Sequence, residues 1–94
     1  MVKPKSLQKS KVVKDINKIS VNSYVWVYKW SDAYYDYWKP GKVIKITPKT
    51  VYVSLIRQTK QSKLKKTFPT KISFTNRIFR INTSLLKQGR LKLA

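Results

Sequence analysis

The residues best suited to chemistry lie in one aromatic stretch, YYDYWKPGK, residues 34–42. Four rings in five positions stand directly before Lys39, and Lys42 follows a Pro-Gly pair. Exposed rings stack on unpaired bases, at about 1–3 kcal/mol per base and with little sequence preference, while nearby lysines neutralise phosphates. Tyr and Trp also anchor protein–protein interfaces. The stretch predicts either base stacking or protein docking, and the sequence leaves both open. The candidate stacking or docking residues are Trp30, Tyr34, Tyr35, Tyr37 and Trp38.

The charge of the chain is strongly one-sided. Its 94 residues include 22 lysines and arginines against three acidic residues, which gives a formal net charge of +19. Such a chain repels itself and gains most from an anionic partner: nucleic acid, an anionic membrane surface or an acidic protein. Lysine predominates over arginine, the side chain that reads guanine edges and phosphates with paired hydrogen bonds. We therefore expect any binding to nucleic acid to be weakly sequence-specific.

The composition excludes several kinds of site. Cysteine and histidine are absent, so disulfides, the usual zinc ligand sets and a His or Cys catalytic relay have no residues to build them. Asp32 and Asp36 lie in a strongly cationic chain, which suits loop capping and pairing with nearby lysines better than metal binding. We expect no enzyme activity, no catalytic residue, no metal and no cofactor.

The sequence shows no targeting segment and no membrane span. The first residues, MVKPKSLQKSK, are basic, but no apolar run follows them. No stretch approaches the roughly 20 apolar residues of a spanning helix, and the amphipathic segment SLLKQGRLKL is short and interrupted by Gly89. We expect a soluble intracellular protein, in cytoplasm or nucleus or inside a virion, that is not secreted and does not act on membranes.

Local patterns divide the chain into an arm, a strand-rich domain and an extension. Residues 1–20 are rich in lysine and poor in apolar side chains, which predicts a flexible basic arm. Residues 21–81 have the two-residue period of strands, with a polar basic loop, QTKQSKLKK, before the last two. Residues 82–94 form a basic C-terminal extension, in which Asn82 to Ser84 are able to cap a short helix. Five strands are expected, at 24–30, 38–47, 50–57, 67–75 and 76–81.

The first expected strand carries large rings at alternate positions. In YVWVYKW, Tyr24, Trp26, Tyr28 and Trp30 fall on one face. Rings that alternate in this way usually form core, and this is the expected role of Trp26 and Tyr28. The register of the second strand stays open, because Lys42-Val43-Ile44-Lys45-Ile46 fits two alternations equally well.

The strand pattern resembles the small SH3-like barrels, in particular their Tudor and KOW branches, over residues 24–81. The likeness rests on VWVYKW, on WKPGKVIKI and on TVYVSL. It implies an all-β, five-stranded barrel with a turn at Pro40-Gly41, where the next strand enters. It also puts Trp30 and Trp38 where Tudor domains place two walls of a cage for methylated residues. Arg57 would then lie at the rim of the cage and repel the bound cation, which disfavours that use.

Two functions fit these observations. The first is a non-catalytic nucleic-acid-binding protein that contacts the phosphate backbone of DNA or RNA with low sequence specificity, within a ribosome, a chromatin-like assembly or a packaged genome. The alternative is a structural or minor capsid component of a virus particle, which docks on protein neighbours through its arms and exposed rings. Arg77, Arg80 and Arg90 are expected to add a contact near the C-terminus. The candidate nucleic-acid-binding lysines are Lys3, Lys5, Lys9, Lys11, Lys14, Lys18, Lys39, Lys42, Lys60, Lys63, Lys65 and Lys66.

Overall fold

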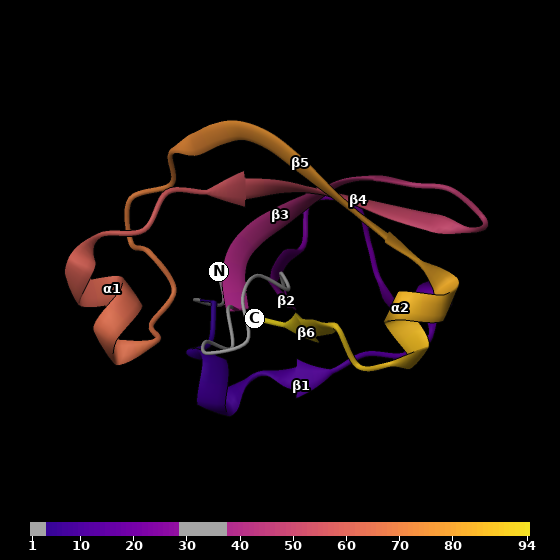
Figure 1. Ribbon diagram of the computed structural model, residues 1–94, viewed down its shortest axis with the longest axis horizontal. Coiled ribbons are helices and arrows are strands. Elements are labelled where there is room, and N and C mark those ends of the chain that lie inside the picture. The colour runs from indigo at the N-terminus through magenta and orange to yellow at the C-terminus, as the bar shows by residue number, and fades with distance from the viewer. Residues whose placement is uncertain (1–3, 29–37) are drawn as a thin grey trace, which may run out of the picture.

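The computed structural model describes residues 4–28 and 38–94, whose strands form one antiparallel sheet (Figure 1). The order of strands across it is β1-β6-β2-β3-β4-β5. The strands are β1 (Lys11–Val12), β2 (Tyr24–Tyr28), β3 (Trp38–Ile46), β4 (Thr50–Ile56), β5 (Phe74–Asn82) and β6 (Leu91–Leu93). Four short helical segments accompany them: the 3₁₀ turns η1 (Leu7–Lys9) and η2 (Ile16–Lys18), and the helices α1 (Lys60–Lys65) and α2 (Thr83–Lys87).

The expected fold class is confirmed as far as a mostly β, antiparallel domain. The described residues contain six strands, whereas five were expected. Within them the sheet ends at β1 on one side and at β5 on the other, and it does not close into a barrel. Figure 1 shows β4 and β5 on one side of the core and β1 and β6 on the other, with β3 curving between them. The sheet is therefore open but strongly curled.

Strand β2 is buried on both of its faces. Val25 and Val27 belong to the main core, which the curled sheet encloses. Trp26 points the other way into a second cluster with Leu7 and Phe68, and it is fully buried. Tyr28 is only half-buried, so the expected core role holds for Trp26 and in part for Tyr28. A run of aromatic and β-branched residues without a polar face is what a strand covered on both sides requires.

Strand β3 contains the Pro-Gly pair that the sequence suggested as a turn. Pro40 and Gly41 lie inside the strand and pair with Trp26 and Val25 of β2. The two possible alternations of residues 42–46 are reconciled by a β-bulge. The register toward β4 shifts between Val43 and Lys45, so Ile44 is the extra residue and stays exposed.

The segment after β4 differs from the expected one. The expected basic loop at 58–66 contains α1, and the strand expected at 67–75 is irregular until Phe74. From there one strand, β5, covers the last two residues of the fourth expected strand and all of the fifth. The expected cap is confirmed, since the Asn82 side chain accepts a hydrogen bond from the backbone N–H of Leu85 at the start of α2.

Residues 4–20 and 82–94 pack into the same fold as the sheet, whereas the sequence suggested a free arm and an extension. In residues 4–20, Leu7 packs against Trp26, and Val13 and Ile19 enter the main core. Strand β1 pairs with β6, which in turn pairs with β2. The indole N–H of Trp26 donates to the backbone carbonyl of Lys5 over 3.0 Å. The apolar residues that look too sparse to fold alone are those that pack against the sheet.

Within residues 4–28 and 38–94, no helix has the length and apolar character needed to cross a membrane.

Candidate nucleic-acid interface

A cationic cleft of about 280 Å³ opens where β3 begins and β4 ends. Four separate segments contribute to it: the start of β3, the end of β4, helix α1 and the first half of β5. Four of the residues described around it are Lys or Arg, and none of them is acidic. The described lining residues are Lys39, Leu55, Ile56, Arg57, Gln58, Lys63, Thr75 and Arg77.

The arginines of the cleft are held by an irregular pairing of β4 with β5. The register shifts between Ser54 and Ile56, and Asn76 adopts a left-handed φ of 65° opposite this point. The Thr75 hydroxyl donates to the carbonyl of Leu55 over 3.2 Å and accepts from the backbone N–H of Arg77 over 3.3 Å. The backbone N–H of Arg57 donates to the carbonyl of Ser73 over 2.8 Å. This bulge brings Arg57 and Arg77 to the same cleft.

Helix α1 supplies Lys63 and is fixed at both ends. The Thr59 side chain caps it by accepting from the backbone N–H of Ser62 over 3.1 Å. The buried Ser62 hydroxyl donates to the carbonyl of Thr67 over 2.6 Å. Lys66 ends the helix with a left-handed φ of 53°. A short helix with few apolar contacts depends on such caps to hold its side chains in place.

Among residues 4–28 and 38–94, the charged side chains that line the cleft are all cationic. Asp15 is the one acidic side chain in residues 4–28 and 38–94, and it is occupied in capping η2, where it accepts from the backbone N–H of Asn17 over 2.9 Å. Cations that lie close together repel one another, and a bound anion relieves that repulsion. The arrangement is therefore suited to binding an anionic group such as a phosphate.

The predicted ring Trp38 is partly structural. It is half-buried, packs against the second cluster and meets Tyr28 edge-on with 5.3 Å between the ring centroids. The ammonium of Lys92 lies 4.8 Å from the Trp38 ring centroid, and the guanidinium of Arg90 lies 4.7 Å from that of Tyr28. The other rings predicted for stacking or docking, Trp30, Tyr34, Tyr35 and Tyr37, lie outside the described residues.

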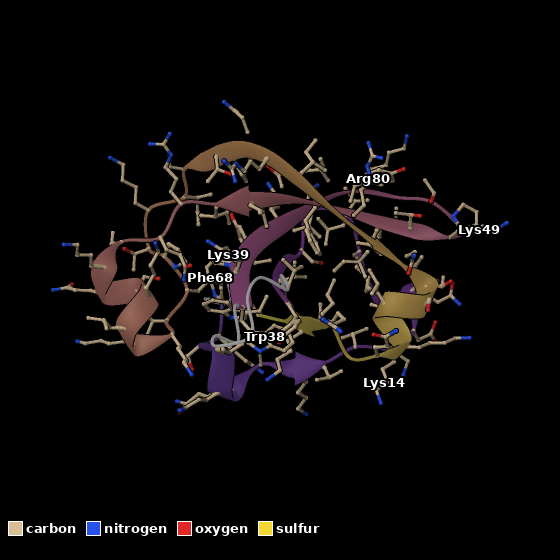
Figure 2. The ribbon with its side chains drawn as sticks, in the orientation of Figure 1. Lys14, Trp38, Lys39, Lys49, Phe68 and Arg80 are labelled. Atoms are coloured by element: carbon tan, nitrogen blue, oxygen red, sulfur yellow. The ribbon has the colours of Figure 1, made fainter. Side chains whose placement is uncertain are left out.

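The structure brings together only some of the predicted lysines. Lys39 and Lys63 line the cleft, whereas Lys42 lies over the Tyr24 ring at 5.9 Å from its centroid. In Figure 2, Lys39 and Lys14 project from different parts of the molecule, and Lys14 lies near α2. Lys3 lies outside the described residues. The remaining predicted lysines are exposed on the N-terminal segment or on α1 and its C-cap: Lys5, Lys9, Lys11, Lys14, Lys18, Lys60, Lys65 and Lys66.

The sequence did not place Arg57 and Arg77 together at one site. From the sequence, Arg57 figured only as an obstacle to a cation cage, and Arg77 only as part of a C-terminal contact. The available signal was that Arg57 follows β4 directly, at the end of a strand, where side chains gather around the rim of a curled sheet. The bulge that turns Arg77 toward the cleft could not be predicted from the residue pattern.

Comparisons with protein-family models, with curated proteins and with solved structures found no match to this chain.

Proposed function

We propose that this protein is a non-catalytic nucleic-acid-binding domain that contacts the phosphate backbone with low sequence specificity. The observation that carries the proposal is the cleft that Lys39, Arg57, Lys63 and Arg77 line together. Phosphate contacts from lysine and arginine supply most of the affinity of non-specific nucleic-acid binding.

The size of the cleft supports a backbone contact. Its volume of about 280 Å³ lies just below the roughly 300–1,000 Å³ of small-molecule pockets and leaves room for a phosphate group. Arg57 and Arg77 are able to hold a phosphate with paired hydrogen bonds, while Lys39 and Lys63 act as point charges. Such a site recognises the backbone and carries no base sequence information.

The exposed lysines of the N-terminal segment and of α1 are proposed to extend this contact. The backbone N–H of Leu7 donates to the carbonyl of Lys66 over 3.0 Å, so η1 lies beside the end of α1. Lys5, Lys9 and Lys65 therefore belong to neighbouring segments that a long polyanion is able to follow. This use suits a component of a large nucleic-acid assembly, either inside a cell or inside a virion.

We also propose that the fold is related to the small SH3-like barrels. Strands β2 to β5 follow one another as a meander, and β6 returns to the free side of β2. A small sheet takes this order when it wraps around its own core. The strand order supports the likeness, although β1 adds a strand beyond it.

The test is binding of the whole chain to a labelled duplex of about 20 base pairs over a series of salt concentrations. A contact with about six phosphates gives a log–log salt slope near −5. The double substitution Arg57→Gln with Arg77→Gln removes two of those contacts, so we expect weaker binding and a slope less steep by about two.

The matched control is Lys49→Gln with Lys87→Gln, which removes the same charge at the opposite end of the sheet. In Figure 2, Lys49 lies far from Lys39, at the turn between β3 and β4. We expect the control to keep nearly all of the slope. If both variants lost affinity and salt slope equally, the cleft would contribute only through the net charge and would not be a specific binding site. A flat slope in the unaltered chain would contradict the proposal and favour protein docking, the structural alternative.

A further inference from the structure

Within residues 4–28 and 38–94, the face of the sheet opposite the main core is covered at one end and open at the other. Its covered end holds Trp26 and Ile56 beneath Leu7, Phe68 and the rest of the second cluster. Its open end lies on β3, β4 and β5. The strand register shows which residues of these strands lie on the same face as Trp26 and Ile56. These residues, the open face, are Lys42, Ile44, Lys45, Tyr52, Ser54, Ile78 and Arg80.

One row of the open face crosses three strands. Tyr52 on β4 pairs with Lys45 on β3 and with Arg80 on β5. The Lys45 ammonium and the Arg80 guanidinium carbon each lie 5.6 Å from the Tyr52 ring centroid. Tyr52 is half-buried, and the backbones of β3 and β5 lie about 10 Å apart on either side of it, since neighbouring strands are about 4.8 Å apart. Figure 2 shows Arg80 on the outer side of the sheet, away from Lys39 and the cleft.

The open face also presents apolar surface beside the charges. Ile78 is 57% exposed, and Ile44, the bulged residue of β3, is 42% exposed. No acidic side chain pairs into the row. Rings, guanidinium planes and apolar side chains stack on base faces, and cations hold the phosphates on either side. A duplex hides its base faces inside the stack, so only a single strand is able to use the ring and the isoleucines.

We infer that the open face is a platform for single-stranded nucleic acid, with Tyr52 as the stacking ring and with Lys45 and Arg80 as its phosphate contacts. The inference rests on the proposed function and deepens it, because it names a class of nucleic acid and a second surface. The cleft holds backbone phosphates of either form, whereas the open face discriminates between them. Binding to a single strand therefore uses both surfaces.

The experiment compares the whole chain with its Tyr52→Leu variant on two labelled probes. One probe is an oligothymidylate of about 20 nucleotides, and the other is a mixed-sequence duplex of the same length. Leucine keeps the apolar volume and the charge but removes the ring. We expect single-strand binding to weaken about ten-fold, which is the loss of one stacked base, and duplex binding to stay within about two-fold. Phe74→Leu, which removes an exposed ring near the other end of β5, is the control and should change neither.

A second measurement uses the unaltered chain and does not depend on how the variant folds. A photoactivatable thymidine analogue in the oligothymidylate should cross-link to the peptide that contains Tyr52. Unchanged single-strand binding in the variant, an equal loss on both probes, or cross-links confined to other peptides would each overturn the inference and leave the cleft intact. Failure of the unaltered chain to bind either probe would instead remove the proposed function itself.

Discussion

At the scale of single residues, Gly41 is the position that the packing constrains most. It lies inside β3 between Val25 on β2 and Leu55 on β4, so both of its sides face neighbouring strands. A Cβ atom at this position would overlap Cγ1 of Val53 and come within 3.0 Å of the carbonyl oxygen of Ser54. Glycine is needed here for close approach of the backbone rather than for a turn.

The substitution Gly41→Ala should therefore lower the free energy of unfolding by about 1–3 kcal/mol, the usual cost of overpacking a core. Urea unfolding followed by tryptophan fluorescence would measure it through the shift of the midpoint. Ser54→Ala, on the adjacent strand, adds no atom and serves as the control. An unchanged midpoint for Gly41→Ala would mean that Val53 moves aside without cost.

At the scale of elements, the main correction concerns the N-terminal segment. Its lysines dominate the composition, but Leu7, Val13 and Ile19 are buried to more than nine-tenths. These three apolar side chains are widely spaced, so they do not form a helical or strand period that would predict their burial. Their partners, Trp26 and Leu91, are distant in sequence, and only the folded sheet brings them together.

Deleting residues 1–20 should unfold or severely destabilise the domain, because it uncovers Trp26 and removes two side chains from the main core. Each buried side chain of this size contributes about 1.5–3 kcal/mol, and a small domain is stable by only about 5–15 kcal/mol. Circular dichroism on heating would show a lost or strongly lowered transition. The control neutralises the segment without shortening it, by changing Lys9, Lys11 and Lys18 to Gln. If the truncated chain had the same melting temperature as the full chain, residues 1–20 would be a free arm that does not stabilise the domain.

Local pattern was sufficient for the elements with a clear two-residue period. Strands β3 and β4 lie within about one residue of the expected ranges, β2 begins where expected, and the Asn82 cap is as expected. The last two residues of the first expected strand, 29 and 30, lie outside the described residues. The local residue pattern did not predict the elements whose structure depends on tertiary contacts. The three-residue strand β6 lies in a segment that reads as tail, and α1 consists largely of lysine and glutamine without an apolar face.

The candidate site was less predictable than the fold for a related reason. Lysine is so frequent in this chain that its positions carry little information, whereas the cleft depends on which of them meet. Lys39 and Lys63 are 24 positions apart, and the bulges at Ile44 and near Asn76 decide where the neighbouring side chains point. A bulge depends on the pairing of two strands and is not visible in either strand alone.

At the scale of the whole molecule, charge and compactness oppose each other. A net charge of +19 is carried by a molecule with a radius of gyration of 12.3 Å. Charges held in so small a molecule repel one another, and salt screens that repulsion. The folded state carries this repulsion more strongly than the expanded unfolded chain does.

Salt should consequently stabilise the domain. Raising sodium chloride from about 20 mM to about 300 mM shortens the screening length several-fold. We expect the melting temperature to rise by about 4–8 °C, which corresponds to about 1 kcal/mol for a domain of this size. Differential scanning fluorimetry would measure it, and the Arg57→Gln with Arg77→Gln variant should start higher and rise less. A melting temperature that falls or stays constant would show that self-repulsion contributes little to the stability.

The position of β6 between β1 and β2 has a consequence for how the chain folds. Strand β1 has no strand neighbour other than β6 among the described residues, and β6 is about 80 positions further along the chain. The meander from β2 to β5 is able to form from local hairpins, which are fast, whereas β1 must wait for the most distant pairing in the sheet. During synthesis β1 is made before β6, so its strand pairing is completed only when residues 91–93 emerge and insert between β1 and β2.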